Sequence, residues 1–214
     1  MSFTYALHNA QEAARIAAKT LLDIEAVLVS PDKPFTLTSG RKSPVYCDCR
    51  RVISFPRARN LLMDFLAQRL ATDAGAESFD MIAGGETAGI PYAALVAERL
   101  GLPMLYVRKK PKGHGRSAQI EGELPEAMPG GRAARVALIE DMMTDGGSKK
   151  VFVDALREAG GEVRHIGVMF HYGIFPQSET NIKEMDVRLH ALANWWDVLA
   201  VIKAERRLAP EQIQ

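Results

Sequence analysis

The middle of the chain, from about residue 79 to residue 170, alternates between strand-like and helix-like segments. Helical spacing of apolar residues covers 88–100 and 148–159, and the strand-like segments around them read FDMIAGG, PMLYVR, RVALIE and VRHIGVMF. Strands that alternate with helices of roughly 10 to 15 residues form βαβ units, whose parallel sheet is covered by helices on both faces. The alternation therefore predicts an α/β fold.

The first quarter of the chain is organised differently. Apolar spacing predicts a helix near residues 9–25, with Asn9 and Glu12 as its capping box. A second helix is predicted from Pro56, at a first helical position, to just before Gly75. The residues between the two helices form short strand-like runs that prolines and a glycine interrupt, so we expect a strand-rich entry segment there.

The part of the chain beyond residue 172 has a weaker pattern, which predicts a helix near 194–205. Trp195 and Trp196 fit core or interface aromatics better than rings that stack on a ligand. No internal repeat or low-complexity tract divides the chain, and its 214 residues with 47% hydrophobic content suit one globular core. We expect a single domain over residues 1–214.

The charges of the chain are nearly balanced. Lys and Arg total 27 against 26 Asp and Glu, so the net charge of +1 creates no global field to hold a nucleic acid or an anionic membrane. The N-terminus lacks the features of a signal peptide, and no run reaches the roughly 18 uninterrupted apolar residues of a membrane span. We therefore expect a cytoplasmic protein that binds neither nucleic acid nor membrane, with any anion site formed locally.

The two cysteines, Cys47 and Cys49, alternate in an extended run. Residues at this spacing point to opposite faces of a strand, which disfavours a mutual disulfide. Without further Cys or His nearby they cannot complete a four-ligand zinc site either. We expect two reduced, packed thiols.

The segment 135–149, RVALIEDMMTDGGSK, combines a buried strand, two acids at its carboxyl end and a small-residue turn that opens a helix. Ligands of parallel α/β sheets bind at the carboxyl ends of strands, and free N–H groups at a helix N-terminus attract anions. Gly146 and Gly147 allow close approach of the backbone, while Thr144 and Ser148 add hydroxyl donors. The segment predicts a phosphate site. The alternative is that the two acids only interact favourably with the helix dipole, which would stabilise the helix by roughly 0.3 to 1 kcal/mol. The segment has neither Walker nor GxGxxG spacing.

A second polar segment, residues 108–123, contains five cationic residues, one His and three glycines in sixteen positions. Such a segment cannot bury itself, so we expect it to be solvated unless it closes over an anion. A solvated charge run and a nucleic-acid patch are the alternatives. The second is disfavoured because the segment lacks interleaved aromatic residues.

The string ALIEDMMTDGGS resembles the phosphoribosyl diphosphate motif of the type I phosphoribosyltransferases. The resemblance implies a twisted parallel sheet flanked by helices, with a small N-terminal hood. It also implies that Glu140 and Asp141 hold the ribose hydroxyls, directly or through the water shell of a Mg²⁺ ion bound mainly by the substrate, and that residues 144–148 wrap the 5-phosphate. Asp145 departs from the neutral residue usual in the family, and we expect its carboxylate to point away from the phosphate.

Further strings narrow the resemblance to the orotate phosphoribosyltransferases. RKKPKGHG resembles their catalytic loop, which acts on the neighbouring subunit of a homodimer, and IAGGETAG resembles their diphosphate-side loop. TSGRKSPVYCDCRRVISFP resembles the segment that closes over orotate, so residues 1–55 and part of the C-terminal segment are expected to form the hood. Thr38 replaces a Lys of many members, and VMFHYGI offers only His171 where some members use Arg for orotate.

The residue roles implied by this resemblance fall into three groups. The catalytic residues are Lys109, Lys112, His114 and Asp141. The residues for phosphoribosyl diphosphate are Arg108, Lys109, Lys112, His114, Glu140, Asp141, Met142, Met143, Thr144, Asp145, Gly146, Gly147 and Ser148. The residues for orotate are Thr144, Lys42, Tyr46 and Arg50.

The implied activity joins orotate to the ribose 5-phosphate of phosphoribosyl diphosphate, yielding orotidine 5'-monophosphate and diphosphate in UMP biosynthesis. Three alternatives stay open: a phosphoribosyltransferase for a purine base, a regulatory protein of the same fold that senses phosphoribosyl diphosphate, and an idle half of a larger pyrimidine complex. The SGRKSP segment argues against the purine enzyme, and the presence of Lys109, Lys112 and His114 argues against the sensor.

Overall fold

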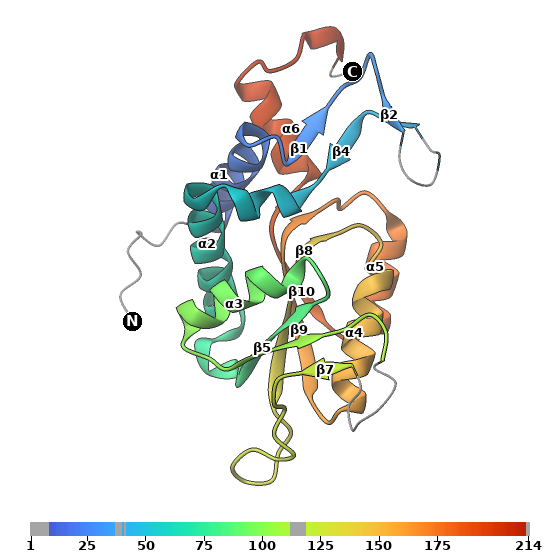
Figure 1. Ribbon diagram of the computed structural model, residues 1–214. Coiled ribbons are helices and arrows are strands. Elements are labelled where there is room, and N and C mark those ends of the chain that lie inside the picture. The colour runs from blue at the N-terminus through green and yellow to red at the C-terminus, as the bar shows by residue number, and fades with distance from the viewer. Residues whose placement is uncertain (1–8, 37–39, 41, 112–118, 213–214) are drawn as a thin grey trace.

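The computed structural model describes residues 9–36, 40, 42–111 and 119–212 (Figure 1). Its main sheet contains six strands within these residues, in the order β10-β9-β8-β5-β6-β7. All neighbouring strands are parallel except β7, which pairs antiparallel with β6. The strands are β5 (Met81–Gly85), β6 (Met104–Val107), β7 (Ile120–Glu121), β8 (Arg135–Met143), β9 (Glu162–His171) and β10 (Arg188–Asn194). The predicted α/β fold with a mainly parallel sheet is confirmed.

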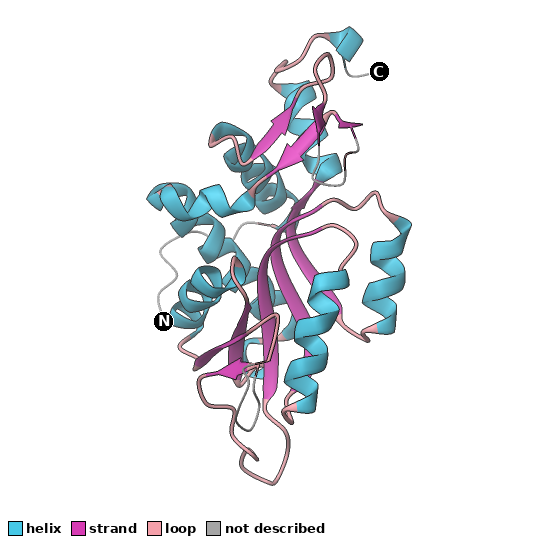
Figure 2. Cartoon of the chain, turned by 45° about the vertical axis from the view of Figure 1, so that its right-hand side comes forward, coloured by secondary structure: helices cyan, strands magenta, loops and turns pink. Residues whose placement is uncertain are grey.

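Helices cover both faces of the sheet (Figure 2). One core contains buried residues of α1 (Ala10–Asp23), α2 (Pro56–Ala74), α3 (Gly89–Leu100) and α6 (Trp195–Ala204). The other contains buried residues of α4 (Gly147–Glu158), and residues at the end of α5 (Pro176–Glu184) pack against it. Strand β8 serves both cores, because alternate side chains of a strand point to opposite faces: Ile139 packs in the first and Leu138 in the second.

The predicted helices are confirmed to within about two residues, whereas two strands and one α-helix of the described residues were not predicted from the sequence. These are β7, β10 and α5. The Asn9 side chain accepts the Glu12 N–H at 2.8 Å, as its predicted capping role requires. Trp195 packs against the first core, but Trp196 is 60% exposed.

A small hood lies beyond the carboxyl edge of the sheet (Figure 1). It consists of two antiparallel pairs, β1 (Val27–Val29) with β4 (Val45–Cys47) and β2 (Phe35–Thr36) with β3 (Lys42–Ser43), followed by the 3-10 helix η1 (Cys49–Ser54). Buried residues of β1, β4 and η1 belong to the same core as the sheet. The hood is therefore anchored by shared packing.

The expectation that Cys47 and Cys49 alternate along one strand is wrong. Asp48 ends the extended run because its side chain accepts the Arg50 N–H and caps η1, which Cys49 begins. The Tyr92 hydroxyl donates to the Cys49 carbonyl at 2.8 Å, which ties α3 to the hood. Both thiols are free, as expected.

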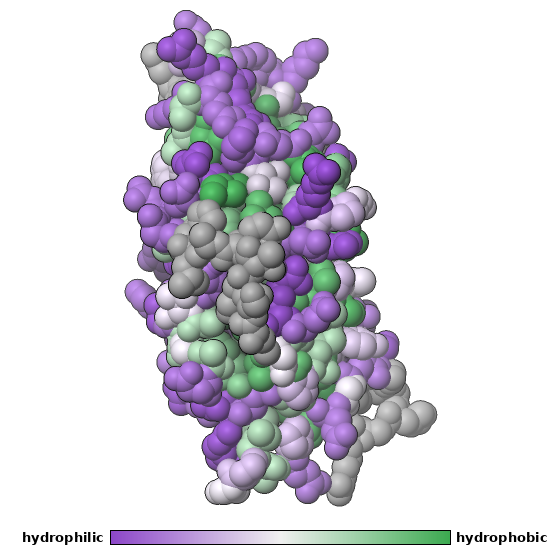
Figure 3. All heavy atoms as spheres, turned by 90° about the vertical axis from the view of Figure 1, so that its left-hand side faces the viewer, coloured by the Kyte–Doolittle hydropathy of each residue, from purple (hydrophilic) through white to green (hydrophobic). Residues whose placement is uncertain are grey.

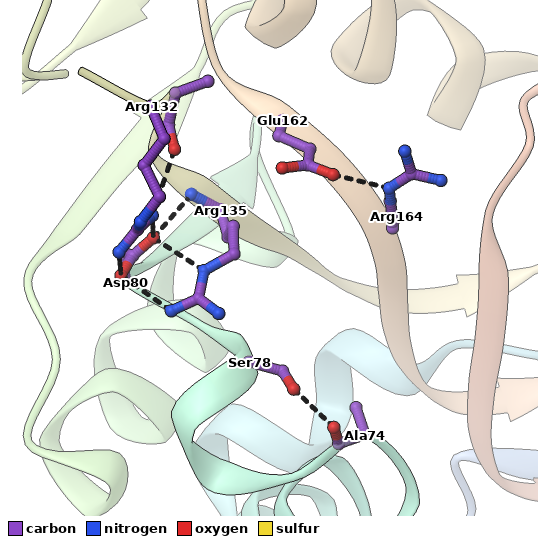
Figure 4. A network of polar contacts seen from close by, with 8 residues as sticks. Ala74, Ser78, Asp80, Arg132, Arg135, Glu162 and Arg164 are labelled. Carbon is purple, nitrogen blue, oxygen red and sulfur yellow. Dashed lines mark hydrogen bonds and ion pairs between the residues drawn. The ribbon is translucent and has the colours of Figure 1, made fainter. Parts of the chain in front are cut away.

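At the amino ends of the strands, on the side of the sheet away from the hood, Asp80 binds two arginines (Figure 4). Its carboxylate accepts hydrogen bonds from Arg132 at 2.5 and 2.8 Å and from Arg135 at 3.0 Å. These guanidinium groups hold the pKa of Asp80 well below its ordinary value. The network joins the start of β8 to the residue before β5, far from the hood.

The face shown in Figure 3 is largely hydrophilic, with hydrophobic residues in smaller patches between polar ones. Within the described residues, no helix combines the length and the apolar character needed to cross a bilayer.

Candidate active site

The centre of the candidate site is the junction between β8 and α4. Thr144 and Asp145 turn the chain after the strand, and Gly146 has a φ of 91°. That left-handed conformation favours glycine, and a Cβ at this position would also collide with the methyl group of Met143. Helix α4 then begins at Gly147, so its first N–H groups face the turn without helical partners of their own. The junction has the geometry of an anion cradle.

The two acids that precede the cradle have different surroundings. Glu140 is 5% exposed, and its Oε2 atom pairs with the Nζ atom of Lys149 at 2.8 Å. Burial raises the pKa of Glu140 to about 7, although Lys149 and Lys109 act in the opposite direction. Both acids come to the carboxyl edge of the sheet, as predicted, but Glu140 is enclosed.

Asp141 is partly buried and lies on the hood side of the edge. Its carboxylate accepts the Met142 N–H at 2.8 Å. Burial raises its pKa, while the cations of Lys149 and Arg50 lower it. Burial raises the pKa of Cys49 in η1 and of Tyr92 in α3, and the charge of Asp141 adds to both increases.

The expectation that the Asp145 carboxylate points away from the cradle is wrong. Its Oδ1 atom accepts the backbone N–H of Gly147 at 3.0 Å, which is one of the cradle's own donors. Aspartate side chains commonly bond the N–H two residues ahead in such turns. The Asp145 carbonyl also accepts a hydrogen bond from the Asn181 side chain at 2.7 Å, so α5 holds the turn from the other side.

The stem of the predicted basic segment is a β-hairpin. The Arg108 N–H donates to the Gln119 carbonyl at 2.8 Å, and the Gln119 side chain donates to the Arg108 carbonyl at 3.0 Å. The Arg108 guanidinium forms an ion pair with Glu121 at 3.5 Å. The Lys109 N–H donates to Glu86 Oε2 at 2.8 Å, and Glu86 belongs to the turn between β5 and α3. The stem is thereby joined to the predicted diphosphate-side loop.

Two members of the predicted catalytic group, Lys112 and His114, lie outside the described residues. Lys109 is described and exposed, and its cation lowers the pKa of Glu140.

The residues predicted to bind orotate are distributed between the cradle and the hood. The Lys42 ammonium donates to the Thr36 hydroxyl at 2.6 Å within the β2–β3 pair. Tyr46 is 37% exposed, and its ring centroid lies 5.7 Å from that of Phe35. Arg50 binds Asp48 through two hydrogen bonds of 2.6 and 3.0 Å and extends toward solvent near Asp141. Thr144 is exposed on the cradle, and Thr38 lies outside the described residues.

His171, the residue that the sequence offered as a partner for the orotate carboxylate, contacts a side chain of α5. Its Nε2 atom lies 3.2 Å from the Ser178 hydroxyl of α5. The next residue, Tyr172, hydrogen-bonds Cys47 of the hood, and its ring packs between Phe170 and Phe175 at centroid distances of 5.3 and 5.6 Å. Tyr172 therefore joins the end of β9 to the hood.

The structure thus adds four residues that the sequence did not single out: Lys149, Asn181, Glu86 and Tyr172. Glu86 and Lys149 lie in segments of predicted importance, but nothing in their spacing indicated their partners. Among the described residues, no three His, Cys, Asp or Glu side chains converge as a protein-only metal site requires.

Residues 56–198 match the model of the phosphoribosyl transferase domain family. An orotate phosphoribosyltransferase of Cereibacter sphaeroides is 59% identical over 194 residues, which cover 91% of this chain and 81% of that protein. The crystal structure of orotate phosphoribosyltransferase from Aeropyrum pernix superposes with a TM-score of 0.71 at 30% identity, covering 90% of this chain and 99% of that one.

A Mycobacterium tuberculosis orotate phosphoribosyltransferase in complex with 5-phospho-α-D-ribosyl 1-diphosphate shares the fold, with a TM-score of 0.65 at 23% identity. That match covers 87% of this chain and 98% of the other. The family match and the identity over most of the chain agree with the motifs in β8, α4 and the hood. The chain belongs to the phosphoribosyltransferase family and, within it, to the orotate phosphoribosyltransferases.

Proposed function

We propose that this protein transfers the ribose 5-phosphate of phosphoribosyl diphosphate to orotate and releases orotidine 5'-monophosphate and diphosphate, a step of UMP biosynthesis. The observation that carries the proposal is the meeting of three elements at one edge of the sheet. The cradle follows β8, the stem of the basic segment follows β6 and is bonded to the β5–α3 turn through Lys109 and Glu86, and the hood shares a core with β8. Ligands of open α/β sheets bind at this edge.

In the proposed reaction the cradle holds the 5-phosphate through the N–H groups and hydroxyls of residues 144–148. Glu140 and Asp141 hold the ribose hydroxyls, directly or through the water shell of a Mg²⁺ ion. The bond between the anomeric carbon and the diphosphate oxygen breaks, and a bond to the orotate ring nitrogen forms, through an oxocarbenium-like state. The leaving electron pair stays on the diphosphate, which Arg108, Lys109, Lys112 and His114 stabilise. An ionised orotate nitrogen needs no protein nucleophile.

The family implies a Mg²⁺ ion that binds mainly to the substrate. The acids at the end of β8 offer carboxylate oxygens, the hard ligands that Mg²⁺ prefers, and would face its water shell. When bound, the ion neutralises charge on the diphosphate. Residues 140 and 141 would contact the ion itself only through that shell.

Orotate is proposed to bind between the cradle and the hood, in contact with Thr144, Lys42, Tyr46 and Arg50. Residues 1–55 and part of the C-terminal segment close over it within a single domain. Two exposed hood residues support this orotate site. The Tyr46 ring offers a flat apolar face, and Arg50 offers a cation for the orotate carboxylate. A purine enzyme would have no use for such a cationic hood.

The protein is proposed to act as a cytoplasmic homodimer with shared active sites. The described ends of the basic segment form a hairpin stem, and the family's corresponding loop serves the neighbouring subunit. In an isologous dimer each site then combines the cradle of one protomer with residues 108–114 of its partner.

The test is an absorbance assay for loss of orotate after addition of phosphoribosyl diphosphate and Mg²⁺, with hypoxanthine and uracil as control bases. Orotate should be consumed in proportion to the diphosphate released, and consumption should stop when the metal is chelated. Release of diphosphate with hypoxanthine but not with orotate would establish the purine enzyme instead. Binding of phosphoribosyl diphosphate without turnover of any base would support the sensor.

A further inference from the structure

A cavity of about 190 Å³ lies at the amino ends of β8 and β9, at the end of the sheet opposite the cradle. Its polar lining consists of Ser78, Arg135, Glu162, Arg164 and His165, four of which are labelled in Figure 4. Sites for cofactors and drug-sized molecules span roughly 300 to 1,000 Å³, so this cavity suits a smaller ligand. The proposed reaction uses none of these residues.

A β-bulge brings two consecutive residues of β9 to this cavity. The register of β8 with β9 shifts after Val163, because Arg164 has no partner on β8. Consecutive residues of a regular strand face opposite sides of a sheet, but the extra residue of a bulge re-aims its neighbours. Val163 and Ile166 both pack in the core that contains α4, so Arg164 and His165 between them share the other face.

The two arginines of the lining keep donors that no group among the described residues uses. Arg135 binds Asp80 through Nε and Nη2, both at 3.0 Å. Arg164 binds Glu162 through Nε at 2.5 Å, and its Nη1 atom lies 3.5 Å from Asp186. A guanidinium has five N–H donors, so Nη1 of Arg135 and Nη2 of Arg164 are left for an anion. Guanidinium groups bind phosphate and carboxylate oxygens through such donors.

The cavity also contains oxygen atoms that accept hydrogen bonds. Glu162 contributes a carboxylate, which only accepts when it is ionised. The Ser78 hydroxyl donates its proton to the Ala74 carbonyl, so toward a ligand its oxygen can only accept. A ligand that satisfies the whole lining must therefore carry negative charge for the arginines and a proton for these acceptors.

His165 adds a third acceptor through a chain of two histidines. His190 is fully buried, its Nδ1 atom lies 3.1 Å from the Asp73 carboxylate, and its Nε2 atom lies 2.9 Å from Nδ1 of His165. Burial lowers the pKa of both histidines, so both rings are neutral at about pH 7. Because the Asp73 carboxylate only accepts, Nδ1 of each ring carries the proton, and Nε2 of His165 is left as an acceptor.

We propose that this cavity binds inorganic phosphate. The remaining N–H groups of Arg135 and Arg164 donate to its charged oxygens. Its P–OH group donates to one of the three acceptors, which belong to Ser78, Glu162 and His165. The site is separate from the proposed reaction, because the cradle lies at the other end of β8.

The lining also determines which related ligands the cavity excludes. Sulfate has the shape of phosphate but no proton at neutral pH, so the Glu162 carboxylate repels it without gaining a hydrogen bond. The phosphate of a nucleotide is disfavoured, because Phe79, the aromatic residue of the lining, is only 4% exposed and offers no face on which a base can stack. The free ion is the ligand that fits both the size and the polar groups.

Nuclear magnetic resonance of the His165 ring tests the proposal. Its imidazole signals, assigned with His165→Gln, report on this cavity separately from the cradle, which also binds a phosphate group in the proposed reaction. Inorganic phosphate should shift these signals along a saturating curve at fixed neutral pH. Sulfate at equal ionic strength should bind at least about tenfold more weakly, because it makes one charge-assisted hydrogen bond fewer.

Three variants identify the groups that bind the ion. Arg164→Gln should weaken phosphate binding about tenfold, because it removes one charged donor. Arg15→Gln is the matched control and should change nothing, since the two arginine side chains are 62% and 59% exposed and each pairs with a nearby acid. Glu162→Gln should raise the affinity for sulfate toward that for phosphate. Orotate consumption should be unchanged in all three variants, so this proposal and the proposed function fail separately.

His165 signals that do not move with phosphate would overturn the proposal. Equal shifts with phosphate and sulfate in the wild-type protein would do so as well, because they would indicate nonspecific ion binding. The same holds for an unchanged phosphate affinity in Arg164→Gln. Adenosine 5'-monophosphate distinguishes the source of the phosphate group: if it binds more tightly than inorganic phosphate, the cavity takes a nucleotide and the assignment to the free ion is wrong.

Discussion

The carboxylate of Asp145 accepts the backbone N–H of Gly147 at 3.0 Å, inside the turn proposed to receive the substrate's 5-phosphate. A carboxylate and a phosphate about 4 Å apart repel each other by roughly 4 kcal/mol at an effective dielectric of 20. The substrate must therefore displace the carboxylate or tolerate its charge.

Asp145→Ala should consequently bind phosphoribosyl diphosphate more tightly, by about tenfold where the substrate displaces the carboxylate and by up to about a thousandfold where the full repulsion is removed. Calorimetry measures the dissociation constant. Asp145→Asn retains an acceptor for the N–H but lacks the charge, so it separates the two causes. Unchanged affinity in both variants would mean that the phosphate binds beyond the reach of this side chain.

Lys109→Ala should lower the turnover number more than it weakens substrate binding. A cation that reaches the diphosphate only as charge develops contributes mainly to the transition state. The comparison requires kcat from initial rates and the dissociation constant from calorimetry, with Lys203→Ala, an exposed lysine of α6, as the control. Lys112→Ala should behave as Lys109→Ala does. Lost binding with intact turnover at saturation would identify a ground-state clamp.

Mixed dimers test the shared site. Lys109→Ala and Asp141→Ala should each be nearly inactive, because every site in either homodimer lacks one part. After random subunit exchange, one site in each heterodimer carries both lesions and the other carries neither, so up to about a quarter of wild-type activity should return. Mass tagging of one variant verifies the exchange. Activity that stays flat after verified exchange would mean that the basic segment serves its own protomer.

The ion pairs of Asp80 should make the stability of the folded protein depend on pH in the acid range. The pKa of Asp80 is lowered in the folded protein by Arg132 and Arg135, so its contribution is complete above the unfolded-state value of about 3.9 and declines as the pH falls toward the folded-state value. Asp80→Asn should unfold at lower temperature than wild type at pH 7, and the difference should shrink below pH 4. Asp186→Asn, at an exposed ion pair with Arg164, should show little change at either pH. A constant difference down to pH 3 would contradict the assignment.

The sequence predicted the elements that carry strong local signals. Strand β8, the turn and α4 are contiguous, so periodicity, glycines and acids all indicated the cradle at once. Elements that depend on distant partners were missed. Helix α5 has one buried residue, Ser178, and β7 pairs through two residues, so neither carries enough apolar pattern to be recognised.

Contacts within the site were less predictable than its location. Asn181 and Asp145 lie 36 residues apart, and Glu140 meets Lys149 only because strand and helix fold back on each other. The orientation of Asp145 was predicted from repulsion by a bound phosphate. The local turn determines it in the structure, because the nearest free N–H is two residues away.

The geometry at Gly146 limits how this loop can change over evolutionary time. Its left-handed φ and the adjacent Met143 methyl impose two separate constraints on one position. A smaller residue at 143 would relieve the collision but not the backbone strain, so a change at 143 alone should not restore the conformation that Gly146 adopts. Genetic selections for revertants of Gly146→Ala should therefore return glycine at codon 146 and not a smaller residue at 143.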